Sequence, residues 1–219
     1  MNVEIVTIGD ELLLGFTIDT NSGFLGRELA SLGVTVARHT TCGDDVGIIV
    51  ETLREAINRT GAVITTGGLG PTADDMTVEA VAKLFDRELV RDDSIAQWLE
   101  QRWIAYARKG PMPVSNYKQA MIPRGAEIIA NPVGSAPGVL VTDERGRWVA
   151  TLPGVPREAR TMFTESLRPR IAALAGEGTV VRSMTLHTIG VGESSIADKL
   201  GELGKGVNGL SLAFIPGIA

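Results

Sequence analysis

The sequence predicts an α/β fold built on a mostly parallel sheet, and three observations support that prediction. Short apolar segments at residues 3–8, 34–39 and 62–66 alternate with longer segments whose apolar residues recur at helical spacing. The first two helical segments end at Gly33 and Gly61, in the position where glycine commonly ends a helix. Polar or glycine-rich turns follow the apolar segments. Repeats of this kind form parallel sheets with right-handed crossovers, so the turns after the strands share one edge of the sheet.

The remaining elements follow from the same two periodicities. Apolar residues at every third or fourth position predict helices, and short apolar runs between turn residues predict strands. Proline suits the first turn of a helix and disrupts its interior, so Pro156 is expected to start a helix and Pro169 to kink or end it. In chain order, the expected elements are a strand at 3–8, a helix from the polar turn 19–22 to Gly33, a strand at 34–39, a helix from Val46 to Gly61, a strand at 62–66, a helix through Val78, Val81, Ala82 and Phe85, a helix at 93–108, a strand at 127–130, a hairpin of strands 139–142 and 148–152, and a helix that starts at Pro156.

The pattern changes near residue 176. A strand at 180–189, a short helix at 193–203 and a strand at 210–215 predict the start of a small second α/β unit. We therefore expect two domains, residues 1–175 and residues 176–219. The second domain stops just after an apolar strand, which indicates that it is truncated or that a partner chain covers this strand.

Composition narrows the class of protein. A chain of 219 residues can bury one core and still form a small second unit. The net charge of −5, without a basic cluster, argues against nucleic acid as a partner. Cys42 is the only cysteine, which excludes an intramolecular disulfide and a thiolate metal cluster. No apolar run reaches the length of a membrane span and no signal peptide is evident, so we expect a cytoplasmic protein with no membrane partner.

The stretch 65–77, Thr-Thr-Gly-Gly-Leu-Gly-Pro-Thr-Ala-Asp-Asp-Met-Thr, carries the strongest functional signal. It lies between a strand and a helix, where glycines let the main chain approach an anion and the helix presents N–H groups to it. Asp74 and Asp75 would repel a bare phosphate but suit a divalent cation held between carboxylate and phosphate oxygens. No Lys-Ser or Lys-Thr pair closes the loop, so it is not a P-loop. The alternative is a tight turn in which Asp74 or Asp75 only caps a helix.

Acidic pairs follow each of the first three predicted strands. In a parallel sheet these pairs gather at one edge, beside the glycine loop, and that many carboxylates near an anion site require a cation. For Glu11 and Asp45, taken singly, we expect a cap or a solvated turn. The pairs are Asp10 with Glu11, Asp44 with Asp45, and Asp74 with Asp75.

Five ordered motifs resemble one known family. They are Gly9-Asp10-Glu11-Leu12-Leu13 with Asp19-Thr20-Asn21, the 65–77 loop, Lys118-Gln119-Ala120, Asn131-Pro132-Val133-Gly134-Ser135-Ala136-Pro137-Gly138, and Leu152-Pro153-Gly154-Val155-Pro156. Together they are similar to the N-terminal domain of the competence/damage-inducible CinA proteins, within the molybdopterin-binding (MoaB/Mog-like) superfamily. The resemblance covers almost the whole chain.

The resemblance implies a three-layer α/β/α fold whose glycine loop binds phosphate. In CinA-like proteins this domain is associated with metal-dependent hydrolysis of ADP-ribose to AMP and ribose 5-phosphate. A separate C-terminal domain of that family deamidates nicotinamide mononucleotide, an activity that we do not assign to this chain. Asp75 matches by position an acid that is essential in the molybdopterin enzymes, and Asp44 matches an acid after their second strand. Leu69 stands where those enzymes usually have threonine, which weakens the case for a pterin ligand.

The hypothesis is therefore metal-dependent hydrolysis of a nucleotide pyrophosphate such as ADP-ribose, by a homodimer. One rival is molybdopterin binding or adenylylation, and another is a non-catalytic nucleotide-binding module. The residues are grouped here by expected role: catalysis by Asp75, Asp44 and Lys118; substrate binding by Gly67, Gly68, Gly70, Thr72 and Ser135; and a divalent metal such as Mg²⁺ held by Asp75, Asp44, Asp10 and Asp74.

Overall fold

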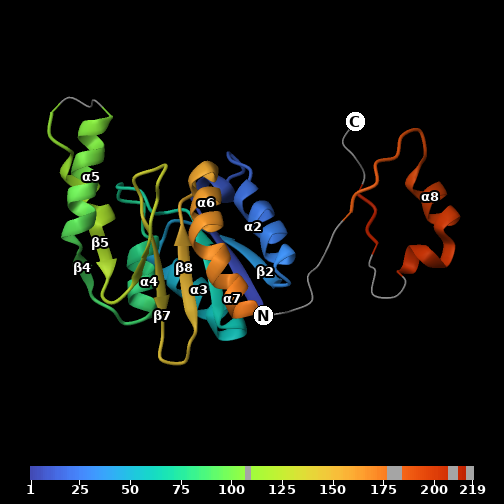
Figure 1. Cartoon of the computed structure of the whole chain (residues 1–219), viewed down its shortest axis with the longest axis horizontal. Coiled ribbons are helices and arrows are strands. Elements are labelled where there is room, and N and C mark those ends of the chain that lie inside the picture. Colours follow the sequence, from blue (N-terminus) through green and yellow to red (C-terminus); the bar gives the residue numbers. More distant parts are fainter. Residues whose placement is uncertain (107–109, 177–183, 207–211, 216–219) are drawn as a thin grey trace. The chain divides into compact units, whose positions relative to one another are not determined.

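The computed structural model of the chain describes residues 1–106, 110–176, 184–206 and 212–215. The chain divides into two compact units, residues 1–182 and residues 183–219. All strands within the described residues lie in the first unit (Figure 1). The first unit also carries every residue to which the sequence analysis gives a functional role.

A six-stranded sheet forms the centre of the first unit, in the order β2-β1-β3-β8-β7-β6. The four strands β2, β1, β3 and β8 are parallel, whereas β7 runs antiparallel to both of its neighbours. This arrangement confirms the predicted mostly parallel sheet. The strands of this sheet are β1 (Asn2–Ile8), β2 (Thr35–Cys42), β3 (Ala62–Thr66), β6 (Glu127–Ile129), β7 (Gly138–Thr142) and β8 (Trp148–Leu152).

Helices cover both faces of the sheet and complete a three-layer α/β/α fold. One buried cluster joins α3, α4 and α5 to one face, and a second cluster joins α2, α6 and α7 to the other face. The helices are α1 (Asp10–Leu13), α2 (Thr20–Ser31), α3 (Val46–Thr60), α4 (Thr77–Leu84), α5 (Asp93–Ala105), α6 (Pro156–Met162) and α7 (Arg168–Ala175), with a 3₁₀ segment η1 (Val114–Ala120) and a π-helical segment η2 (Phe163–Leu167).

Local sequence explains most of the element boundaries. The side chain of Asp19 caps α2 by accepting from the Ser22 N–H, and Asp45 caps α3 by accepting from the Gly47 and Ile48 N–H groups. Gly61 ends α3 in the left-handed conformation that favours glycine. Strand β2 is longer than predicted because residues 40–42 continue its pairing with β1 although two of them are polar.

Three features were not predicted. The three-residue strands β4 (Leu89–Arg91) and β5 (Met121–Pro123) pair antiparallel as a separate two-stranded sheet, drawn in green beside α5 (Figure 1). The turn after β1 forms the one-turn helix α1. The helix that starts at Pro156 does not end at Pro169; it passes through η2 and resumes as α7, with Pro169 at the second residue of α7.

The second unit has less regular structure than predicted. It contains α8 (Glu193–Leu200) and the 3₁₀ segment η3 (Gly201–Lys205), which together cover the predicted helix. The predicted strands at 180–189 and 210–215 lie partly outside the described residues. Their described parts, residues 184–189 and 212–215, have no strand structure. Across the described residues of both units, no helix has the length and apolar character needed to span a membrane.

Candidate functional site

The glycine loop begins where three strands end. Gly67 follows β3, adopts a positive φ of 102°, and donates its N–H to the Leu152 carbonyl of β8 at 3.0 Å. A Cβ atom on Gly67 would overlap the carbonyl oxygen of Ile8, the last residue of β1. Only glycine therefore fits at the point where the carboxyl ends of β1, β3 and β8 meet.

The first turn of α4 holds the start of the loop. The hydroxyl of Thr77, which is fully buried, donates to the Gly67 carbonyl at 2.8 Å, and the Thr77 N–H donates to the Gly68 carbonyl at 3.2 Å. Gly68 also has a positive φ, and a Cβ there would meet the Thr77 hydroxyl. These contacts direct the carbonyl groups of both glycines toward the protein.

Asp75 and Lys118, both predicted to be catalytic, contact the far end of the loop. The Asp75 carboxylate accepts from the N–H of Thr72 at 2.8 Å and from its hydroxyl at 2.5 Å. The Lys118 ammonium donates to the Thr72 carbonyl at 2.5 Å and to the Ala73 carbonyl at 3.4 Å. A Cβ on Gly70 would collide with the Asp75 carboxylate. In this structure both charged side chains therefore help to fix the conformation of the loop.

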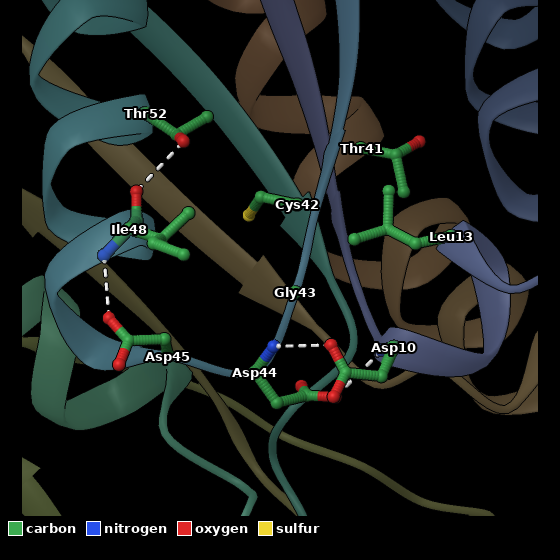
Figure 2. Close-up of a pocket in the computed structure, with 9 residues that line it drawn as sticks. All are labelled: Asp10, Leu13, Thr41, Cys42, Gly43, Asp44, Asp45, Ile48 and Thr52. Atoms are coloured by element: carbon green, nitrogen blue, oxygen red, sulfur yellow. Dashed lines mark hydrogen bonds between the residues drawn. The ribbon is translucent and has the colours of Figure 1, made fainter.

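Asp10 and Asp44 form a second feature at the same edge of the sheet. The Asp10 N–H donates to the Asp44 carboxylate at 2.9 Å, and the Asp44 N–H donates to the Asp10 carboxylate at 3.3 Å (Figure 2). The pKa of Asp44 is raised, mainly because partial burial disfavours its charge and also because the acids Asp10, Glu11 and Asp74 lie near it. Acids from the turn after β1 and from the glycine loop therefore act on one carboxyl group, that of the acid after β2.

A pocket of about 460 Å³ opens beside this pair, between α1, β2 and α3. Figure 2 shows Asp10 and Asp44 side by side, with Leu13 on the α1 side and Ile48 on the α3 side. Cys42 also lines the pocket, and burial raises the pKa of its thiol to about 11, so the thiol stays protonated at neutral pH. The pocket combines acidic, hydroxyl and apolar groups.

The structure brings together some of the predicted metal ligands but not all of them. Asp10 and Asp44 pair directly, and Asp74 is close enough to act on the charge of Asp44. Asp75 instead contacts Thr72 within its own loop. Within the described residues, no group of three or more His, Cys, Asp or Glu side chains is placed to hold a metal ion. Asp45 is the helix cap that we expected.

The motif at residues 131–138 is organised by one buried side chain, that of Asn131. Its side-chain oxygen Oδ1 accepts from the N–H groups of Val133 and Gly134, and its side-chain NH₂ group donates to the Ala136 carbonyl and to the Glu158 carboxylate. This network leaves Ser135, a predicted substrate contact, exposed and without a hydrogen bond to any described residue.

Leu69 has a structural position inside the loop. Its side chain is only 5% exposed. A side chain at this position packs into the protein, so the replacement of threonine by leucine does not remove a hydroxyl from the surface of the loop.

Two residues that organise the site had no role in the sequence analysis. One is Thr77, and the other is Asn21, whose buried amide donates to the Gly154 carbonyl at 2.8 Å and so ties α2 to the loop after β8. A Cβ atom on Gly154 would lie 3.5 Å from the Cα of Gly67, so the loop after β8 lies next to the glycine loop. The available signal was a polar residue at the start of each helix, which sequence alone cannot distinguish from an ordinary cap.

A family model covers most of the first unit. Residues 4–173 match the model described as a probable molybdopterin binding domain. Over 219 residues the chain is 57% identical to a CinA-like protein of Gemmatimonas aurantiaca, an alignment that covers 99% of this chain and 51% of that protein. It is 43% identical to a CinA-like protein of Deinococcus radiodurans, over 94% of this chain and 50% of that protein. The chain thus spans about half the length of the curated relatives that it matches.

Solved structures agree with the family model. The protein CinA from Thermoplasma acidophilum, described as having unknown function, is 35% identical, with a TM-score of 0.71 and coverage of 78% of this chain and 97% of that chain. MoaB from Thermus thermophilus, described as a molybdopterin biosynthesis enzyme, is 26% identical, with a TM-score of 0.52 and coverage of 80% of this chain and 95% of that chain.

Proposed function

The chain belongs to the family of probable molybdopterin-binding domains and is similar to CinA-like proteins, and from that premise we propose that it is a metal-dependent nucleotide pyrophosphatase. The proposed substrate is ADP-ribose or a related dinucleotide, which is cleaved to AMP and ribose 5-phosphate. The observation that carries the proposal is the position of a glycine loop, whose central N–H groups donate to no described residue, beside a pair of like-charged carboxyl groups. Anion donors and a cation site next to each other match a pyrophosphate bound with a divalent metal.

The carboxyl groups at this edge fit a divalent cation of the Mg²⁺ type. Each carboxylate of the Asp10–Asp44 pair uses one oxygen for the partner's N–H and keeps the other oxygen free of hydrogen bonds to the described residues. Mg²⁺ is commonly held by one or two carboxylates together with water and substrate phosphate oxygens. Asp10 and Asp44 would hold the ion, and Asp74 would add to the negative potential around it.

The side chains of the site then have separate tasks. The loop N–H groups of Gly68, Leu69 and Gly70 bind the pyrophosphate oxygens. Asp75 keeps the loop in shape through Thr72 with one carboxylate oxygen, and its other oxygen, which has no hydrogen bond to a described residue, would add its charge to the cation site. When bound, the divalent cation supplies charge neutralisation and activation of the attacking water. Lys118 places a positive charge on the rim of the loop, where it favours a polyanionic substrate.

The direct test is hydrolysis of ADP-ribose with and without a divalent metal, with AMP formation as the readout. We expect metal-dependent cleavage by the wild-type chain and a loss of at least about a hundredfold in Asp75→Asn, the size typical of a lost electrostatic contribution at a reaction centre. Asparagine can still accept a hydrogen bond from Thr72, so the loop should keep its fold while its charge is lost. The matched control is Asp198→Asn, the same change at an exposed position in α8.

Two results would count against the proposal. Equal rates in wild type and Asp75→Asn would remove Asp75 from the reaction. No cleavage by folded wild-type protein with any divalent metal would refute the hydrolase assignment itself.

Molybdopterin binding is the second candidate, because the family model carries that description and the fold resembles MoaB. The same loop would then hold the phosphate of the pterin. Tight pterin binding without ADP-ribose cleavage would favour this function. Binding of AMP with no dependence on metal and no cleavage of either ligand would favour a non-catalytic nucleotide-binding module.

A further inference from the structure

Five of the seven carbonyl groups at residues 67–73 of the glycine loop accept hydrogen bonds from described residues. Thr77 binds the carbonyls of Gly67 and Gly68. Lys118 binds those of Thr72 and Ala73. Between these two anchors the loop has one further attachment, at the carbonyl of Leu69, which accepts from the side-chain amide of Gln119 at 3.2 Å.

In contrast to these carbonyls, the N–H groups in the middle of the loop make no hydrogen bond within the described part of the chain. They are the N–H groups of Gly68, Leu69 and Gly70. Because each peptide plane carries its carbonyl and the next N–H on opposite sides, a bond to the Leu69 carbonyl fixes the direction of the Gly70 N–H. Gln119 therefore controls the orientation of a donor at the centre of the loop.

The side-chain amide of Gln119 is buried, and only its nitrogen has a hydrogen-bond partner among the described residues. Its side chain is only 7% exposed, and its amide nitrogen faces the Leu69 carbonyl, since the reverse orientation would place two oxygens against each other. The amide oxygen is then buried and has no hydrogen-bond partner among the described residues. A buried acceptor without a partner is destabilising, but an apolar side chain would remove this oxygen only by leaving the buried Leu69 carbonyl without its donor. The one hydrogen bond that the Gln119 side chain makes to a described residue is therefore the bond that holds the middle of the loop.

We propose that Gln119 is a positioning residue that aligns the N–H groups of the glycine loop for the phosphate oxygens of the substrate. The proposal rests on the proposed function only in that the loop binds phosphate; it does not depend on hydrolysis. Gln119 does not touch the anion. It acts through the Leu69 carbonyl, and its removal leaves the loop attached at both ends but free to rotate in the middle.

The test measures binding of inorganic pyrophosphate by isothermal titration calorimetry, to the whole chain and without added metal. The variant Gln119→Met removes the donor and the orphan oxygen together, at similar side-chain volume. We expect about tenfold weaker pyrophosphate binding, the size of one lost hydrogen bond of typical strength, with little change in melting temperature, because the variant removes one buried acceptor without a partner and leaves another, the Leu69 carbonyl. The matched control is Gln101→Met, the same change at an exposed position of α5, with wild-type affinity expected.

A second variant, Gln119→Glu, tests the positioning role by the pH dependence of its pyrophosphate affinity, which a purely structural role would not change. Gln119→Glu places a buried carboxyl group against the Leu69 carbonyl, and only its protonated form can donate a hydrogen bond. Burial raises the pKa of such a group. The affinity of Gln119→Glu for pyrophosphate, relative to wild type at the same pH, should therefore recover as the pH falls from about 8 to about 5.5, whereas the relative affinity of Gln119→Met should stay constant.

Each outcome decides the proposal. Wild-type affinity in Gln119→Met, or a flat relative affinity in Gln119→Glu, would overturn it. Absence of pyrophosphate binding by the wild-type chain would also overturn it, because the loop would then not be an anion site, whatever the ADP-ribose assay gives. Weaker binding in Gln119→Met together with a wild-type chain that does not cleave ADP-ribose would support the positioning role and refute only the hydrolase assignment.

Discussion

The two ends of strand β1 place acidic side chains in opposite electrostatic surroundings. Near its start, Glu4 is 1% exposed and receives two hydrogen bonds of 2.8 Å from the Arg59 guanidinium of α3. Just past its end, Asp10 faces Asp44, another acid. The charged groups that act on Asp44 are all acidic. One end of the strand is neutralised by the fold, and the other is left with excess negative charge.

The difference between the Glu4–Arg59 pair and the Asp10–Asp44 pair distinguishes a charge that stabilises the fold from a charge that suits a ligand. A bidentate arginine pair satisfies a buried carboxylate completely, and the pKa of Arg59 is raised by Glu4. A like-charged pair has no such compensation inside the protein, so it destabilises the fold until a cation binds. The carboxyl edge of the sheet, where ligands bind in folds of this class, is the place where such a cost is expected.

The largest effect should come from removal of the counter-ion at the start of β1. Arg59→Met leaves the Glu4 carboxylate buried and unpaired, and we expect the melting temperature to fall by roughly 5–10 °C. Arg54→Met, at an exposed position on the same helix, is the matched control and should change little. Calorimetric melting measures both. If Glu4→Gln added to Arg59→Met failed to restore part of the loss, the unpaired charge would not be its cause.

An intermediate effect is expected at Asp45, the neighbour of Asp44. Its carboxylate accepts from two N–H groups at the start of α3, at 2.8 and 2.9 Å, so its charge is satisfied locally. Asp45→Ala should lower the melting temperature by roughly 2–4 °C through loss of the cap. Asp45→Asn keeps a capping oxygen and should cost much less. Equal losses in the two variants would show that the negative charge, and not the cap, is what matters.

The smallest effect should have the opposite sign. Asp44→Asn keeps an oxygen for the Asp10 N–H but removes the like charge, so the metal-free protein should melt roughly 1–2 °C higher at about pH 7. Because the folded-state pKa of Asp44 is raised, its charge costs stability above that pKa, and the cost disappears as the pH falls to the ordinary aspartate value. The advantage of the variant should therefore shrink on acidification.

Magnesium provides the control for this comparison. Added Mg²⁺ should raise the melting temperature of the wild-type chain and have less effect on Asp44→Asn. A variant that is less stable than wild type at neutral pH, or that keeps its advantage at low pH, would contradict the assignment of unrelieved charge to Asp44.

Much of the fold could be predicted from the sequence because its determinants are local. Alternating strands and amphipathic helices, with glycine at helix ends, predicted the parallel sheet and most element positions. The strands β4 and β5 were missed because three residues are too few to show a period of two, and Pro123 within β5 argues against a strand. The expected strands of the second unit were wrong in their described parts, since alternation alone does not supply a neighbouring strand to pair with.

The candidate site, like the fold, could be predicted from the sequence only in part. The sequence located the glycine loop and the acids that follow the strands, since each depends only on its place in the chain. It could not determine that Asp75 and Lys118 contact the loop itself, or that Asp44 would carry the raised pKa. These outcomes depend on the directions of side chains within turns, which residue type and spacing do not specify.

The sequence by itself thus determined the order of elements, the family and the edge of the sheet at which chemistry is placed, because periodicity and glycine positions are properties of neighbouring residues. Only the tertiary structure decided which groups meet there. Asp10 and Asp44 are 34 positions apart, and Lys118 lies 46 positions from Thr72. The parallel register of β1 with β2 and β3 brings the turns of this edge together, and burial of β1 and β3 on both faces holds these two strands in place.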